Sequence, residues 1–187
     1  HVECVMKKHL TYEDAYRIAV VRRRTWPKKD ELSLEDFART LMPTDAEKDE
    51  PDSHAARHFV IRDGDAIVAH SHVFGREIAT ADGPMTILAL ARVCSDPDHR
   101  GKGYGRDVVA AAFSVVDKGL FTACLYQTSY AVKPFYEKLG AYQIHNRIVN
   151  SLSDEPDKNP FWNELVMLYP RAVTLPEGDV DLRGDGY

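Results

Sequence analysis

Residues 92–105 hold the residue types in this chain that are best suited to binding an anion. An apolar run over 87–93 leads through Asp96-Pro97 into a basic, glycine-rich turn, and a helical pattern follows at once. Glycine lets backbone N–H groups come close to an anion, and a helix that begins there adds its positive end. Three basic side chains add charge: Arg100, Lys102 and Arg106. The order of these features predicts a site for a phosphate or pyrophosphate group that needs no metal.

Two widespread phosphate-binding signatures are absent from the sequence. The Walker loop needs Gly-x4-Gly-Lys-Ser/Thr, and no such string occurs. The dinucleotide fingerprint needs Gly-x-Gly-x-x-Gly, but Arg106 or Val108 occupies the third glycine position, depending on where the pattern starts. The pattern that remains is Arg100-x-x-Gly103-x-Gly105, which a basic surface turn would also show.

A second segment with chemical potential follows at 129–141, Ser-Tyr-Ala-Val-Lys-Pro-Phe-Tyr-Glu-Lys-Leu-Gly-Ala. It places Tyr136 on a short helix that ends at Gly140, with Ser129 on the approach to that helix. A tyrosine phenol can act as a general acid toward a leaving group. The alternative is that Tyr136 is a core residue on an amphipathic helix.

Together the two segments resemble the coenzyme A signatures of the GNAT N-acetyltransferase family. The turn is similar to Gln/Arg-x-x-Gly-x-Gly/Ala, and the second segment is similar to a helix ending in Tyr-Glu-Lys-Leu-Gly-Phe, with Ala141 and Tyr142 at the last position. The strong resemblance covers about residues 85–142, which would form the acyl-CoA-binding core. It implies an α/β protein with the GNAT acyl-CoA N-acyltransferase fold. In that fold a mixed, mostly antiparallel sheet of about six or seven strands is flanked by helices, here as a single domain over 1–187.

The resemblance also implies an activity and assigns roles. The expected enzyme transfers the acetyl group of acetyl-CoA to a primary amine of a small-molecule or peptidyl acceptor, by direct attack in a ternary complex. Tyr136 would be the general acid to the thiolate, the backbone N–H of Cys94 would face the oxyanion, and Ser129 would orient the pantetheine or Tyr136. Residues expected to bind the co-substrate are Val93, Cys94, Ser95, Arg100, Gly101, Lys102, Gly103, Tyr104, Gly105, Arg106, Ser129 and Tyr136.

The general base is less defined. An alkyl ammonium with a pKa near ~10.4 must lose a proton before it attacks. The candidates are His70, His72, Glu77 and His145, and a water chain is the alternative to all of them. His70 and His72 point to the same side of a strand, so they form the best pair if that side faces the cleft and drop out if it packs on a helix.

Cys94 raises the alternative that a thiol carries the acyl group before transfer. A cysteine within an apolar strand is more commonly an inert small hydrophobe. Two alternative functions stay open for the chain: a non-catalytic sensor that binds acyl-CoA, or an enzyme that uses a longer acyl-CoA. Ala91 stands where aminoglycoside acetylation would suggest an acid, which argues against antibiotic modification, although the tail at 166–170 and 178–187 is similar to the aminoglycoside 2′-N-acetyltransferase and nodulation acyltransferase branch.

Composition is consistent with an enzyme domain. The chain has 187 residues, 44% of them hydrophobic, and a net charge of −5, which disfavours nucleic acid as a partner. No apolar stretch reaches the ~20 residues of a membrane span and no signal peptide is evident, so no membrane contact is expected. Three cysteines, Cys4, Cys94 and Cys124, lack metal-ligand spacing, which indicates reduced thiols, a cytoplasmic location and no metal.

The expected elements follow from capping and periodicity. Helices are expected from Thr11 to about Trp26, from Ser33 to Leu41, after the glycine turn as far as Gly119, and around Tyr136. Strands are expected at 59–62, 66–78, 85–95, 120–127, 142–152 and 165–169, with a hairpin turn at Asp63-Gly64.

Two regions carry open alternatives. Residues 44–57 are expected to be an acidic loop, which favours a cationic acceptor, and the Arg22-Arg23-Arg24 run is expected to be a solvated helix face or the border of a substrate entrance. The strand at 142–152 would suit a homodimer edge, and a monomer stays equally open.

Overall fold

The computed structural model describes residues 1–27 and 32–187, and these residues divide into two compact units. The first unit combines 1–74 with 91–114, and the second combines 75–90 with 115–187. The expected architecture is confirmed: mixed, mostly antiparallel strands with helices beside them. Nine strands are described instead of six or seven, because β1 and β9 were not expected and one expected strand is divided into β6 and β7.

Antiparallel pairing builds the strands of the first unit. β1 (Glu3–Met6) pairs with β2 (Arg57–Asp63), which pairs with β3 (Ala66–Thr80). β4 (Gly83–Ser95) follows in the strand order, and both β3 and β4 continue along the chain into the second unit. The hairpin between β2 and β3 is confirmed, with its turn at Gly64-Asp65, one residue later than expected. β1 was not expected.

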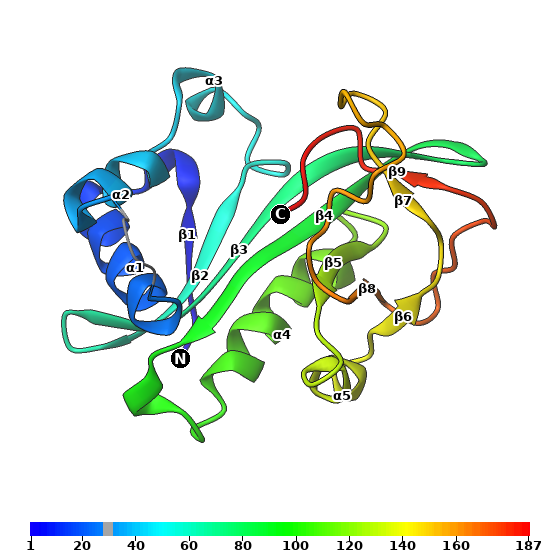
Figure 1. Cartoon of the computed structure of the whole chain (residues 1–187). Helices are drawn as coiled ribbons and strands as arrows, with labels where there is room; N and C mark the ends of the chain where they lie inside the picture. The colour runs from blue at the N-terminus through cyan, green and yellow to red at the C-terminus, as the bar shows by residue number, and fades with distance from the viewer. Residues whose placement is uncertain (28–31) are drawn as a thin grey trace. The chain divides into compact units, whose positions relative to one another are not determined.

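Two predicted helices belong to this unit, α1 (Tyr12–Thr25) and α2 (Leu34–Leu41) (Figure 1). Both begin as the capping pattern indicates, because the Thr11 and Ser33 hydroxyls accept hydrogen bonds from the backbone N–H groups of Asp14 and Asp36. Their apolar sides pack with residues of β2, β3 and β4 in one core. The buried members of this core are Leu10, Ala15, Ile18, Ala19, Val21, Ala38, Val60, Ile67 and Cys94.

The acidic segment is only partly a loop, which corrects the expectation for 44–57. It contains α3 (Asp45–Lys48), a one-turn helix that Thr44 and Glu47 close with a reciprocal capping box. A short helix, η1 (Lys7–His9), precedes α1 and pairs with α3 through Lys7 and Glu47, whose charged atoms are 2.6 Å apart. Periodicity gave no signal for α3, because four residues are too few to show one.

α4 (Tyr104–Asp117) follows the glycine-rich turn, after a short helix, η2 (Pro97–His99). Within the first unit, α4 packs on the face of β3 opposite to His70 and His72, because the Ser71 hydroxyl donates to the Val108 carbonyl at 2.9 Å. The helix ends before Gly119, whose φ of +83° is the left-handed conformation that commonly closes a helix.

The strands of the second unit pair in both directions, parallel and antiparallel. β4 runs parallel to β5 (Cys124–Thr128), with Leu88 opposite Cys124, and β5 pairs antiparallel with β8 (Leu165–Tyr169). β8 also pairs with β6 (Tyr142–Ile144), and α5 (Lys133–Lys138) lies between β5 and β6 in the chain. The strand expected at 120–127 therefore begins only at Cys124.

The strand expected at 142–152 is wrong as a single element. It is divided into β6 and β7 (Ile148–Val149) by residues whose side chains bind the chain at 176–179. The Asn146 amide donates to the carbonyls of Pro176 and Gly178, and Arg147 pairs with Asp179 at 2.6 Å. These contacts turn the backbone away from the ladder.

The C-terminal segment is bound to the second unit. β9 (Val180–Asp181) pairs with β7 and with Ala79 of β3, and the Tyr187 hydroxyl donates to the Leu125 carbonyl at 2.6 Å. Among the residues described here, no helix has the length and apolar character to cross a bilayer.

Candidate functional site

The glycine-rich turn has the backbone geometry of an anion cradle. Gly101 and Gly103 have φ angles of +83° and +80°, which side-chain-bearing residues rarely adopt. The first intrahelical bond of α4 runs from the Asp107 N–H to the Gly103 carbonyl at 3.1 Å. The N–H groups of the residues before Asp107 therefore precede the intrahelical ladder, where α4 is positive. This arrangement fits a phosphate group.

An ion-pair network anchors the turn to α1. The Asp96 carboxylate accepts from the Asp98 N–H at 2.8 Å and from Arg24 Nε at 2.7 Å. The Arg24 hydrogen bonds lower the pKa of Asp96 to about 2. His99 pairs with Asp63 at 3.0 Å. Arg24 is exposed, as expected for the arginine run, and its guanidinium also binds the carboxylate that caps η2.

The end of β4 carries an unusual backbone conformation. Arg92 has a φ of +59°, which is rare for a residue with a side chain and is typical of a bulge. It lies just before Val93, Cys94 and Ser95, the residues expected to face the pantetheine. The Thr25 hydroxyl donates to the Ser95 carbonyl at 3.3 Å, so α1 also holds this strand end.

The Cys94 side chain is buried, and burial raises the pKa of its thiol to about 11. A thiol with that pKa is almost entirely protonated at neutral pH, and the thiolate is the nucleophilic form. The geometry therefore disfavours the alternative in which Cys94 carries the acyl group, and it leaves the backbone N–H as the useful part of the residue.

In the second unit, Tyr136 lies on α5 and is 5% exposed. Its ring packs against that of Tyr126, with centroids 4.7 Å apart, and burial raises the pKa of its phenol well above the ordinary value. Gly140, with a φ of +100°, ends α5, and the Ala141 N–H reaches back to the Tyr136 carbonyl at 3.2 Å. The Ser129 carbonyl accepts hydrogen bonds from the backbone N–H groups of Val132 and Lys133, at the start of α5. Ser129 and Tyr136 are thus held by the same short segment.

The base candidates lie in different surroundings. His70 is fully buried on the face of β3 that packs toward α1 and α2, and burial lowers its pKa well below the ordinary value, as it does for His72. This is the packed arrangement under which the pair was expected to drop out as the base. Glu77 and His145, in the second unit, have exposed side chains.

Sequence reasoning missed His58 as a partner of these histidines. His58 Nδ1 lies 2.8 Å from His70 Nε2, and the His58 ring stacks on that of His72, with centroids 4.7 Å apart. The sequence carried no signal for this pairing, because an irregularity between Ile61 and Arg62 shifts the register by one residue and brings His58 opposite His72, whereas the turn alone would place it opposite Ser71. Nothing among the described residues arranges three or more His, Cys, Asp or Glu side chains to hold a metal ion.

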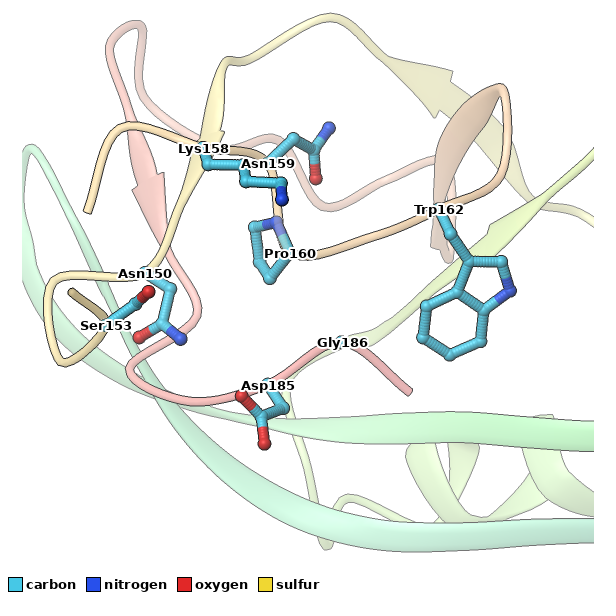
Figure 2. A pocket seen from close by; sticks show the side chains of 8 residues that line it. All are labelled: Asn150, Ser153, Lys158, Asn159, Pro160, Trp162, Asp185 and Gly186. Carbon is cyan, nitrogen blue, oxygen red and sulfur yellow. The ribbon is translucent and has the colours of Figure 1, made fainter. Parts of the chain in front are cut away.

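A separate pocket of about 340 Å³ lies in the second unit (Figure 2). Residues of the 150–162 segment and the C-terminal segment line it: Asn150, Ser153, Lys158, Asn159, Pro160, Trp162, Asp185 and Gly186. None of the residues predicted from the sequence to bind the co-substrate belongs to this lining. Its walls combine one exposed indole with amide and charged groups.

Comparison with known proteins was made on sequence and on structure. The family model described as "Acetyltransferase (GNAT) domain" matches residues 8–144. No curated protein matches the chain in sequence.

Several solved structures share the fold at low sequence identity. A GCN5-related N-acetyltransferase from Kribbella flavida is 19% identical, with a TM-score of 0.57 over 76% of this chain and 33% of that one. Escherichia coli ElaA is 14% identical, with a TM-score of 0.58 over 90% of this chain and 97% of that one. Glucosamine-6-phosphate N-acetyltransferase from Arabidopsis thaliana is 16% identical, with a TM-score of 0.54 over 74% and 89%. The chain thus spans a third of the first protein and most of the other two.

Proposed function

The chain belongs to the GNAT family and is an acyl-CoA-dependent N-acetyltransferase, and we propose that it transfers the acetyl group of acetyl-CoA to a primary amine by direct attack in a ternary complex. The observation that carries this proposal is the turn at Gly101 and Gly103, where positive φ angles lead directly into α4. Such a turn supplies backbone N–H groups and a helix end to a pyrophosphate.

The co-substrate would be held by the residues predicted from the sequence. Backbone N–H groups over 101–106 would bind the pyrophosphate, with Arg100, Lys102 and Arg106 adding charge from exposed positions. The backbone of Val93, Cys94 and Ser95 would bind the pantetheine arm, and the Cys94 N–H would face the oxyanion that forms at the acyl carbonyl. The positive φ of Arg92 supports this role, because it is a departure from regular strand conformation directly before these residues.

Tyr136 would act on the leaving group. Its phenol keeps its proton at neutral pH because burial raises its pKa, so it can donate to the departing sulfur. A thiolate in a buried site is also a stronger base than in water, which favours that transfer. Ser129 would keep the segment in place. No single side chain is proposed as the general base; a water chain is proposed to take the proton from the acceptor ammonium.

We also propose that residues 1–187 act as one acetyltransferase domain, because the matched region 8–144 takes residues from both units. The buried thiols of Cys94 and Cys124 support a reducing, cytoplasmic location. The proposed partner is an amine-bearing acceptor. The β6 strand ends the strand order, so a homodimer formed through it stays an alternative to a monomer.

The first experiment is calorimetric titration with acetyl-CoA and with desulfo-CoA. We expect micromolar binding of both, and its loss in Gly103→Glu, whose side chain would add bulk and negative charge to the cradle. The matched control is Gly64→Glu, which places the same side chain at another positive φ, +60°, in the β2–β3 turn. If the unsubstituted protein did not bind either ligand, or if both variants lost binding equally, the turn would be a basic surface turn and not the coenzyme A site.

The second experiment separates the enzyme from a non-catalytic acyl-CoA sensor. It measures thiol release with a library of amines and with acetyl-CoA or longer acyl-CoA donors. Turnover with any amine, lost in Tyr136→Phe, supports the enzyme. Tight acyl-CoA binding without turnover across the library supports the sensor.

A further inference from the structure

Arg22, on α1, is a largely buried cation with no acidic partner among the residues that the structure describes. No hydrogen bond or ion pair is formed by its side chain within residues 1–27 and 32–187, and its Nε is enclosed without an acceptor. Its guanidinium lies 4.9 Å from the centroid of the Phe37 ring. Burial and the nearby charge of Arg92 lower the pKa of Arg22 to about 10, so the group stays charged at neutral pH. An unpaired buried charge is costly, and a bound anion would offset that cost.

Three histidines lie beside this cation with unused ring nitrogens. His58 and His70 are 2% and 0% exposed and share one hydrogen bond, and both are close enough to Arg22 for its charge to disfavour their protonation. His58 Nε2, His70 Nδ1 and His72 Nε2 are enclosed without hydrogen-bond partners among the described residues. Because both paired rings are neutral, the shared bond leaves one outer nitrogen as a donor and the other as an acceptor. Buried polar atoms of this kind are normally satisfied, so they point to a ligand or ordered water.

The surrounding charges do not compensate the cation. Glu47, whose charge acts to raise the pKa of His58, already pairs with Lys7 at 2.6 Å. Asp96 is committed to Arg24. Arg92 adds a second positive charge from an exposed position on β4. The cluster of Arg22, Arg92, His58, His70 and His72, which we call the Arg22–Arg92 cluster, therefore carries two positive charges with no acid of its own.

We propose that the acceptor of this enzyme carries an anionic group, a carboxylate or a phosphate, which binds at the Arg22–Arg92 cluster while the acceptor amine faces the β4 end at Cys94. This inference rests on the proposed function. Arg92 precedes Cys94 by two residues, and the charge of Arg22 acts on the Cys94 thiol, so the cluster adjoins the position proposed for the acyl carbonyl. Guanidinium groups are well matched to both anions.

The acceptor and the co-substrate differ in what they offer to this cluster. The pyrophosphate of coenzyme A is assigned to the turn at 101–106, and the pantetheine arm and the acetyl group, which lead from it to the end of β4, carry no charge. The anion therefore belongs to the acceptor. The proposed substrate class is an amine that also bears an acid, which adds an anionic group to the cationic acceptor that the acidic segment at 44–57 favours.

The test begins with coenzyme A at saturation, so that the glycine-rich turn is filled and any further anion must bind elsewhere. Succinate and inorganic phosphate are then added at about 10 mM, and the melting temperature is followed. We expect a rise in the unsubstituted protein, no rise in Arg22→Met, and a partial rise in Arg22→Lys. Arg39→Gln is the matched control, because Arg39 is an exposed arginine on α2 that pairs with Asp36. No rise in the unsubstituted protein, or an equal rise in Arg22→Met, would overturn the proposal.

A second experiment measures turnover to determine whether the anion that binds at the cluster belongs to the acceptor or to the acyl chain. Matched amines that differ in one acid are compared by thiol release with acetyl-CoA: 4-aminobutyrate with butylamine, phenylalanine with phenethylamine, and O-phosphoethanolamine with ethanolamine. We expect at least one acid-bearing amine to exceed its partner in kcat/KM by about tenfold or more, and Arg22→Met to abolish the difference. The proposal would be overturned if the amine without the acid were preferred in every pair, or if none of the amines were turned over. It would also be overturned if Arg22→Met lowered turnover only when succinyl-CoA replaced acetyl-CoA as donor, because the anion would then belong to the acyl chain. Failure of coenzyme A binding itself would instead contradict the proposed function.

Discussion

The Tyr136 phenol is buried next to a second buried tyrosine, so its contribution can be separated from that of its ring. Tyr136→Phe removes only the hydroxyl. We expect kcat to fall by about 10- to 100-fold, because a positioned general acid contributes at least that much to rate, while acetyl-CoA binding is unchanged. Thiol release and calorimetry measure the two effects. The control is Tyr126→Phe, which deletes the neighbouring hydroxyl. If both variants lose activity equally, Tyr136 has no special role.

Cys94 allows a similar separation of side chain from backbone. Cys94→Ala deletes a thiol that is protonated at neutral pH and keeps the N–H proposed to face the oxyanion. We expect kcat to change by less than about threefold and stability to fall by about 1 kcal/mol, since the side chain packs in the core. Steady-state kinetics and denaturant unfolding measure both. Loss of turnover in a folded Cys94→Ala protein would restore the covalent alternative.

Single residues differ in how well their sequence signals revealed them. Gly101 and Gly103 could be predicted, because the chemistry of a phosphate cradle requires positive φ at such positions. Arg92 could not, because nothing in the type of an arginine indicates a φ of +59°. Arg22 was hidden for a different reason. A run of three arginines is typical of a solvated helix face, and only the packing of α2 shows that the guanidinium groups of Arg22 and Arg23 lie over the Phe37 ring.

Between elements, the Arg24–Asp96 pair joins α1 to the approach to the glycine-rich turn. Hydrogen bonds from Arg24 lower the pKa of Asp96 from 3.8 to about 2. A carboxyl group with a depressed folded-state pKa adds stability above its unfolded-state pKa, and this contribution is lost as the pH falls through the folded-state value. We therefore expect Asp96→Asn to lower the free energy of unfolding at pH 7. The difference from the unsubstituted protein should shrink between about pH 4 and pH 2.

Denaturant unfolding at several pH values measures this difference. Asp154→Asn serves as the control, because it neutralises an exposed carboxylate in the 150–162 segment. A difference for Asp96→Asn that is the same at pH 7 and pH 2 would contradict an ionised Asp96 in the folded protein. A similar pH-dependent difference for Asp154→Asn would show that overall charge, not the pair, is responsible.

Helices were more predictable than strands at this scale, for a physical reason. The start of α1 is fixed by a local hydrogen bond from the Asp14 N–H to Thr11, which the sequence displays directly. The break between β6 and β7 depends on contacts of Asn146 and Arg147 with residues about thirty positions later. Such long-range contacts have no local signal, so the apolar pattern alone suggested one continuous strand.

For the molecule as a whole, the fold followed from two short segments. The turn at 100–106 and the helix of Tyr136 fixed the family and with it the order of strands and helices. The C-terminal segment was less predictable. A stretch rich in glycine and aspartate resembles a loose end, yet a Cβ at Gly186 would overlap the Pro160 carbonyl, so this segment is tightly packed. Packing of that kind depends on the partner surface and not on composition.

Ligand binding should change the stability of the entire protein if the proposed co-substrate site is correct. A ligand that binds only the folded state stabilises it by about 2.7 kcal/mol at a hundred times its Kd. For a chain of this size, we expect acetyl-CoA at that concentration to raise the melting temperature by about 5–10 °C. Pantetheine, which lacks the pyrophosphate, should raise it by far less at the same concentration, because the cradle at Gly101 and Gly103 would stay empty. Differential scanning calorimetry measures both shifts. Equal shifts with the two ligands would mean that the pyrophosphate contributes nothing and that the turn is not the binding determinant.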